Sequence, residues 1–255
     1  AIGAADTKVP FSESVHQMLL EEVANYWLVG GLPDVVKTFT ETQDITACQN
    51  QQQILAATYR EDFHKYANKA NVEYLRILFQ GIPRLLSQKF KYSQIDEGIR
   101  ARELSAALNQ LCMAGLAYKV HHSSANGLPL GAQIDLKKFK IFFIDIGLCQ
   151  RLLGLNLAEQ FVHRKELIAN RGALAEQFVA QELLSYTGRN QAPALYYWHR
   201  EAKSSQAEVD LIAEHDAQIL PIEVKSGRSG SVKSLQLFLK EKSNYVERGL
   251  KVSAL

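Results

Sequence analysis

The chain has 255 residues, and 47% of them are hydrophobic, so it is long and apolar enough to bury one large core or several smaller ones. Lys and Arg together number 29 against 27 for Asp and Glu, and a net charge of +2 excludes a protein that binds nucleic acid through overall basicity alone. Any basic surface must come from local clustering.

The cysteines and the N-terminal segment indicate a cytoplasmic protein. Cys48, Cys112 and Cys149 are odd in number and include no C-x-x-C pair, which predicts reduced thiols in the core. Residues 1–10 lack the basic start and apolar stretch of an export signal, and no run approaches the roughly 20 apolar residues of a membrane span.

Residues 1–70 are predicted to form a helical bundle. A first helix, at 13–29, is ended by Gly30-Gly31-Leu32-Pro33, and Pro33 opens a second helix because its ring fixes the first-turn dihedral. Asp44 is the predicted N-cap of a third helix, at 45–67.

Residues 71–155 are predicted to form a winged helix-turn-helix. A helix that breaks near Gly81, a connector, a second helix at 99–114 and a hairpin that turns at 126–129 follow the order of that fold, whose second helix can enter the major groove of DNA. The candidate DNA-binding residues are Arg100, Arg102, Lys119, His121 and His122. A protein-contact module fits the same order equally well, because acidic residues dilute the positive charge.

Asp145 follows an apolar strand, and its predicted role is to N-cap the next helix rather than to act in catalysis. Residues 156–170 are the predicted linker to a final domain at 171–255.

The final domain begins with a predicted helix, ALAEQFVAQELLSY (173–186), which Arg171-Gly172 introduces and Gly188 closes. Glu176 shares a helical face with small and apolar residues, so its carboxylate is either half-buried or directed at a ligand. Gln177, Gln181 and Glu182 lie elsewhere on the helix and are predicted to be ordinary polar coverage. Three strands, a helix at 229–242 and a last strand complete the order helix, three strands, helix, strand.

The second and third of these strands are predicted to form a hairpin that turns at 215–217. Alternation places Glu208 with Asp210 on one strand face, and Glu223 with Lys225 on the other strand, so that Asp210 and Glu223 can lie side by side. Two carboxylates and an amine suit a hard divalent cation and the stabilisation of negative charge. The same E-x-K pattern is equally typical of a solvated strand with a cross-strand charge pair.

This order, with Glu176 in the first helix, Asp210 in the second strand and Glu223-x-Lys225 in the third, resembles the PD-(D/E)XK nuclease superfamily, which includes archaeal Holliday-junction resolvases and RecB-type nucleases. Nearly the whole chain resembles the C-terminal region of prokaryotic AAA-type ATPases of unknown function, in which such a domain follows a helical and winged-helix region. The segments that carry this resemblance are WLVGGLPDVV (27–36), ATYREDFHKYA (57–67), RARELSAALNQLCMAGLAYKV (100–120), RGALAEQFVAQEL (171–183), AEVDLIAE (207–214) and PIEVKSG (221–227).

The resemblance implies a metal-dependent site. Asp210 and Glu223 would ligate Mg²⁺ or Mn²⁺, with Glu176 as an outer ligand. Lys225 would orient the attacking water or stabilise the pentavalent phosphate, and Gln236 would support the site.

Two departures from the families are visible. No Walker A sequence G-x-x-x-x-G-K-[ST] occurs, so we expect no ATP site, and we expect the chain to be a fragment that the ATPase module precedes in the full polypeptide. RecB-type members also carry a Tyr four residues after the helical Gln, whereas Lys240 occupies that position after Gln236.

The expected fold is therefore a multi-domain α+β protein: a helical bundle, a winged helix-turn-helix and an α/β restriction-endonuclease-like domain of order αβββαβ. The expected function is metal-dependent hydrolysis of DNA phosphodiester bonds by the C-terminal region of an AAA-type ATPase. The alternative is a non-catalytic DNA-binding, protein-interaction or regulatory module of that ATPase. DNA is the expected partner, no membrane association is expected, and the sequence is compatible with an oligomer.

Overall fold

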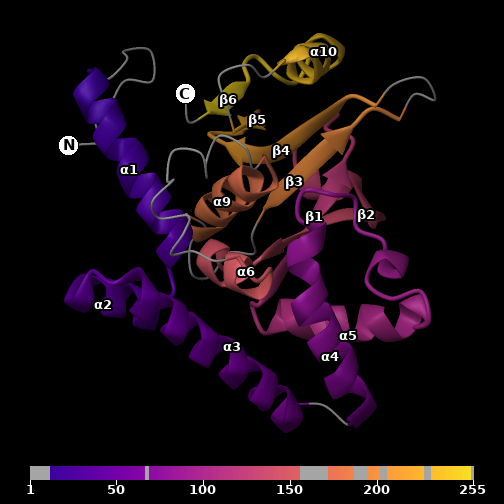
Figure 1. Cartoon of the computed structure of the whole chain (residues 1–255). Coiled ribbons are helices and arrows are strands. Elements are labelled where there is room, and N and C mark those ends of the chain that lie inside the picture. The colour runs from indigo at the N-terminus through magenta and orange to yellow at the C-terminus, as the bar shows by residue number, and fades with distance from the viewer. Residues whose placement is uncertain are drawn as a thin grey trace.

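The computed structural model has an α+β fold with a mixed six-stranded sheet (Figure 1). It describes residues 12–66, 69–155, 172–186, 194–201, 206–226 and 231–253. The predicted linker at 156–170 lies outside the described residues.

Eight α-helices occur in the described residues. They are α1 (Glu13–Val29), α2 (Pro33–Thr42), α3 (Ile45–Tyr66), α4 (Lys69–Gly81), α5 (Ala101–Met113), α6 (Ile146–Leu152), α9 (Gly172–Ser185) and α10 (Lys233–Glu241). The predicted break near Gly81 is confirmed, because α4 ends there and a 3₁₀ turn, η2 (Ile82–Leu85), follows. The last predicted helix is also present, but it begins at Lys233.

The six strands form one sheet in the order β2-β1-β3-β4-β5-β6. They are β1 (Ala117–Ser123), β2 (Ile134–Phe143), β3 (Leu195–His199), β4 (Glu208–His215), β5 (Gln218–Lys225) and β6 (Leu250–Ser253). β1 with β2, β3 with β4 and β4 with β5 pair antiparallel, whereas β1 with β3 and β5 with β6 pair parallel.

The parallel pairing of β1 with β3 joins the two halves of the chain. His121 lies opposite Tyr196, and His122 lies opposite Tyr197. The hairpin predicted as a wing does form, but it is built into the central sheet rather than standing free of it. The predicted division at 71–155 and 171–255 stays a prediction, and the structure shows that both segments contribute to one sheet.

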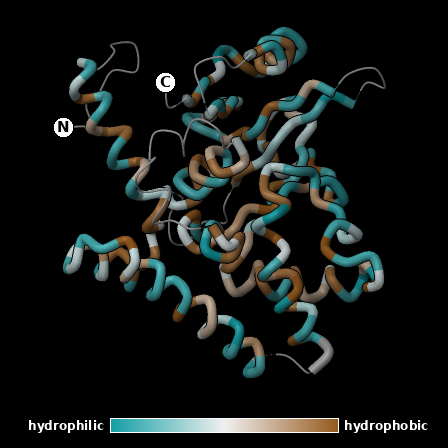
Figure 2. The backbone as a smooth tube through the Cα atoms, viewed as in Figure 1, coloured by the Kyte–Doolittle hydropathy of each residue, from teal (hydrophilic) through white to brown (hydrophobic). Residues whose placement is uncertain are grey.

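Helices cover the two faces of the C-terminal strands. On one face α9 packs Ala175 and Val179 into the main core, which also contains Leu211. On the other face α10 packs Phe238 in a smaller core with Ile212. Adjacent strand residues thus enter different cores, as the alternation of a β-strand requires. In Figure 2, α10 carries both hydrophilic and hydrophobic residues, as expected for a helix with one covered side.

The predicted role of Asp145 as the N-cap of α6 is confirmed, and its side chain has a second role as well. Its Oδ1 accepts a hydrogen bond from the Leu148 N–H at 2.8 Å, while Oδ2 accepts one from the Gly31 N–H at 2.7 Å. The side chain of Asp145 therefore fastens the turn between α1 and α2 to α6. Gly30 is required in this turn, because its φ is +79° and a Cβ there would lie 2.3 Å from Asp145 Oδ1.

Asp145→Ala should lower the free energy of unfolding by about 3 kcal/mol, because it removes a helix cap and leaves the buried Leu148 N–H and the part-buried Gly31 N–H without an acceptor. Asp44→Ala is the matched control, since Asp44 caps α3 by accepting from the Thr46 N–H at 2.8 Å but is exposed. The control should cost about 1 kcal/mol. Urea unfolding of the two variants measures the difference, and equal losses would contradict the second role of Asp145.

Candidate active site

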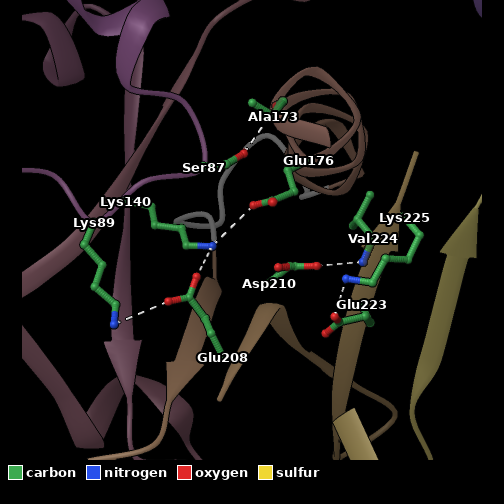
Figure 3. A network of polar contacts seen from close by, with 10 residues as sticks. All are labelled: Ser87, Lys89, Lys140, Ala173, Glu176, Glu208, Asp210, Glu223, Val224 and Lys225. Carbon is green, nitrogen blue, oxygen red and sulfur yellow. Dashed lines mark hydrogen bonds and ion pairs between the residues drawn. The ribbon is translucent and has the colours of Figure 1, made fainter. Parts of the chain in front are cut away.

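The structure brings four of the five predicted catalytic residues to one end of the C-terminal strands (Figure 3). Glu176 projects from α9, Asp210 from β4, and Glu223 with Lys225 from β5. Gln236 is exposed on α10 and is not part of the network that Figure 3 draws. The catalytic roles of these residues stay predictions.

A β-bulge places Asp210. Tyr196 pairs with Ile212 and Trp198 pairs with Val209, so β4 has one residue more than β3 between these two pairs. The carboxylate Oδ2 of Asp210 accepts a hydrogen bond from the Val224 N–H at 2.8 Å, just beyond the last paired residues of β4 and β5. Asp210 is therefore held by both its bulge and the neighbouring strand.

Glu223 is a buried carboxylate with an incompletely satisfied head group. Its side chain is 4% exposed, and Oε1 accepts a hydrogen bond from the Lys225 ammonium at 2.6 Å. Its other oxygen, Oε2, is buried and has no hydrogen-bond partner in the part of the chain that the structure describes. Burial and the nearby Asp210 raise the pKa of Glu223. This oxygen is thus available to a cation or a proton.

Lys140 of β2 is the residue at this site that sequence reasoning missed. Its side chain is fully buried, and its Nζ lies 2.7 Å from Glu208 Oε1 and 3.3 Å from Glu176 Oε2. Burial by itself lowers the pKa of Lys140, but the surrounding carboxylates, led by Glu176, more than offset this and raise the pKa above its ordinary value. The ammonium is therefore a fixed positive charge inside the site.

A signal for Lys140 was present in the sequence. It is the one charged residue in the run Phe139–Phe143 of an otherwise apolar strand. A lysine in such a position is buried only when it is paired with acids, so the run predicts carboxylate partners without saying where in the chain they are.

Glu176 carries the largest carboxyl pKa shift at the site. Burial raises its pKa to about 7, with Asp210 adding to the effect and Lys140 opposing it. Burial also raises the pKa of Asp210, again opposed by Lys140. Carboxylates with raised pKa values gain from an added cation, which can replace the proton that they otherwise retain.

The geometry favours a metal held by two of the three predicted ligands. The carboxylate oxygens of Glu176, Asp210 and Glu223 do not all lie within 4.8 Å of one another. Mg²⁺ needs only one or two protein carboxylates because it keeps several waters. Asp210 and Glu223, with its unpaired Oε2, fit that requirement, whereas Glu176 is already engaged by Lys140.

Two glutamines of α9 hydrogen-bond this helix to the first half of the chain. Gln177 is fully buried, accepts from the Phe143 N–H at 2.8 Å and donates to the Phe143 carbonyl at 2.8 Å. Gln181 accepts from the Ile146 N–H and donates to the Tyr26 hydroxyl, each at 2.9 Å. The prediction that both were ordinary polar coverage was wrong, because backbone groups of a segment remote in sequence supply their partners.

The five candidate DNA-binding residues lie in different surroundings. Arg100 and Arg102 are exposed at the start of α5. Lys119 donates to Asn109 Oδ1 at 2.5 Å, and the half-buried ring of His121 packs on Phe139. His122 is only 3% exposed, so its surroundings do not suit contact with DNA at the surface.

Two family models match the chain. Residues 20–159 match a domain of unknown function, DUF8612, and this match covers more than half of the chain. The chain belongs to the DUF8612 family. Residues 171–254 match a second domain of unknown function, DUF4143. Comparison with curated proteins and with solved structures gave no significant match. None of the helices in the described residues has the length and apolar character needed to cross a membrane.

The candidate site is composite, because both matched segments contribute to it. The DUF8612 segment supplies Lys140, and the DUF4143 segment supplies Glu176, Glu208 and the residues of the β4–β5 hairpin. The fixed ammonium of the DUF8612 segment therefore sets the charge balance of the carboxylates in the DUF4143 segment.

Lys140→Met should lower the free energy of unfolding by about 3–5 kcal/mol, because it leaves buried carboxylates without their cation. Lys89→Met is the matched control, since Lys89 contacts the same Glu208 at 3.4 Å but is half exposed. We expect the control to cost less than about 1 kcal/mol. Urea unfolding at pH 7.5 compares the two variants, and similar losses would show that Lys140 is not the organising charge.

Glu176 should also make stability depend on pH. Because its pKa rises from 4.5 to about 7 on folding, the native protein keeps a proton that the unfolded chain has lost between these values. The free energy of unfolding should therefore fall as pH rises through this window, by up to about 1.4 kcal/mol per pH unit, and level off above it. Urea titrations from pH 5 to 8 with EDTA should show a smaller slope for Glu176→Gln than for the wild type.

Proposed function

We propose that Asp210 and Glu223 form a divalent-metal site that hydrolyses DNA phosphodiester bonds, within the C-terminal region of an AAA-type ATPase. The observation that carries the proposal is the buried, unpaired Oε2 of Glu223 beside Asp210 and Lys225. A buried carboxylate oxygen without a donor is costly unless a cation or a proton completes it.

Two further observations support this proposal. The elements from α9 to β6 follow the order αβββαβ expected of a restriction-endonuclease-like domain, with the acidic residues on α9, β4 and β5. DUF4143 is known as a C-terminal domain associated with AAA-type ATPases, in agreement with the proposed position of this chain behind an ATPase module.

The residues of the chain would divide the work as follows. A bound Mg²⁺ or Mn²⁺ would activate water and neutralise charge on the phosphate oxygens. Asp210, fixed by the Val224 N–H, would hold the ion together with Glu223. The Lys225 side chain is 26% exposed, so its ammonium can leave Glu223 and turn to a phosphate whose negative charge is building up.

The helical segment before the sheet is the proposed substrate- or partner-binding part. Arg100 and Arg102 are exposed at the start of α5, where a winged-helix unit would present its recognition helix. These two arginines would contact phosphate groups, the kind of contact that positions a protein on DNA without reading its sequence.

Lys140 favours a second candidate function, that of a non-catalytic module. Its ammonium already supplies Glu176 and Glu208 with the positive charge that a metal would supply in a nuclease. In that case the domain would bind DNA or position the ATPase without cleaving any bond.

The decisive experiment measures cleavage and metal binding together. Purified protein is incubated with linear and branched DNA in Mn²⁺ or Mg²⁺, and Mn²⁺ binding is measured by calorimetry. Asp210→Asn and Glu223→Gln should each reduce cleavage by at least about 100-fold. Asp216→Asn is the matched control, because Asp216 lies exposed in the turn of the same hairpin and should leave cleavage unchanged.

The outcomes separate the two candidates. DNA binding without cleavage, unaffected by Asp210→Asn or Glu223→Gln, would support the non-catalytic module. Absence of both cleavage and an Asp210-dependent calorimetric signal would overturn the nuclease proposal.

A further inference from the structure

Two histidines and a glutamate meet on the sheet beside the carboxylate network, although His122 lies far from the other two in the sequence. His122 comes from β1, His199 ends β3, and Glu201 follows two residues later. One potential ligand atom from each lies within 4.8 Å of those of the other two, and the two imidazole centroids are 4.3 Å apart. It is the parallel pairing of β1 with β3, with His122 opposite Tyr197, that brings them together.

We propose that His122, His199 and Glu201 bind a divalent transition-metal ion of the zinc type. Two imidazoles and one carboxylate are the ligand set of zinc sites that leave a fourth position open for water or substrate. Imidazole suits Zn²⁺, Cu²⁺ or Ni²⁺ rather than Mg²⁺, so this site would select a different ion from the carboxylate pair. The proposal is independent of the proposed nuclease function.

The hydrogen bonds of the two rings fit metal ligation. His122 Nε2 lies 3.3 Å from the His199 carbonyl oxygen, and His199 Nδ1 lies 3.3 Å from the Arg200 carbonyl oxygen. If each of these nitrogens donates its proton to the carbonyl, His122 Nδ1 and His199 Nε2 are left with free lone pairs. Metal-bound histidines are held in this way, with the second ring nitrogen donating to a backbone carbonyl or a carboxylate.

Burial keeps both rings in the neutral form that a metal requires. Desolvation is the main cause that lowers the pKa of His122, to about 4, and that of His199 as well. His122 also packs edge-on against Tyr197, which restricts its ring. The site therefore has at least one ligand, His122, whose position is set by packing before any ion arrives.

The charges around His122, His199 and Glu201 are compatible with an added cation. The Glu201 carboxylate lies 2.7 Å from the Lys138 ammonium, which also contacts Asp135 at 3.3 Å. Lys138 is 40% exposed, so it can turn to Asp135 and solvent when an ion takes Glu201. Lys89 and Glu208 also face His199, and they have opposite charges.

The proposed ion would lie next to the carboxylate network rather than within it. His199 is the cross-strand partner of Glu208, the residue that holds Lys140. The ring of Tyr197 lies between the two, since it contacts His122, His199 and the Lys140 ammonium.

Metal titration of tag-free protein tests the proposal. Zn²⁺ affinity is measured by competition with a chromophoric chelator, and Co²⁺ is added as a spectroscopic probe, because its visible absorption reports nitrogen ligation and coordination number. We expect one tight equivalent in the wild type, and a loss of affinity of about 100-fold or more in His199→Gln. Glu201→Gln, at an exposed position that should not disturb folding, should weaken binding by at least about tenfold.

Two variants serve as controls. His215→Gln removes an exposed histidine of the β4–β5 hairpin and should leave Zn²⁺ affinity unchanged. Asp210→Asn should also leave it unchanged, which separates failure of this proposal from failure of the nuclease proposal. Urea unfolding in EDTA verifies that each variant is folded. Absence of tight Zn²⁺ binding, or equal affinities of His199→Gln and His215→Gln, would overturn the proposal.

Discussion

The burial of one ammonium group, that of Lys140, is the constraint on which the site depends. A fully buried lysine is tolerated only when anions surround it, and its anions come from α9 and β4, far along the chain. Its charge in turn opposes the effect of burial, which raises the pKa values of Glu176 and Asp210. The carboxylate of Glu208 is paired with the Lys140 ammonium, and that of Glu176 is only partly offset by it. The carboxylate of Glu223 is paired with Lys225 instead. These three acids thus range from paired to partly unpaired within one site.

The sheet carries two environments whose ligand atoms differ in hardness. Carboxylate oxygens at the β4–β5 end favour Mg²⁺ or Mn²⁺, whereas the imidazoles at the β1–β3 junction favour zinc-like ions. Each environment draws on both matched segments: Lys140 and His122 come from the DUF8612 segment, and their partners come from the DUF4143 segment. The His122–His199–Glu201 group therefore needs both segments, whereas Asp210 and Glu223 both lie in the DUF4143 segment and depend on the other segment only through the charge of Lys140.

The sequence predicted those features that short-range interactions determine, such as helix caps, helix breaks and hairpins. The caps by Asp44 and Asp145, the break near Gly81 and the hairpin with its E-x-K strand all follow from short-range geometry, and the structure contains them. The parallel pairing of β1 with β3 could not be predicted, because no periodicity specifies which remote strand a strand will join. The hydrogen bonds of Gln177 to Phe143 and the burial of His122 both depend on how the two halves of the chain come together. Neither was predicted, for the same reason.

The long separation between Lys140 and its counterions also affects how the chain is made. During synthesis β1 and β2 leave the ribosome before α9, β3 and β4 exist, and at ordinary elongation rates the delay is on the order of ten seconds. Throughout that time β1 has a free edge where β3 will later pair, and Lys140 has no carboxylate partner from Glu176 or Glu208. An uncompensated lysine beside an open edge discourages both premature collapse of that face and pairing with a second nascent chain. The same ammonium that pairs with carboxylates in the folded protein would thus first protect the nascent β1–β2 hairpin from wrong contacts.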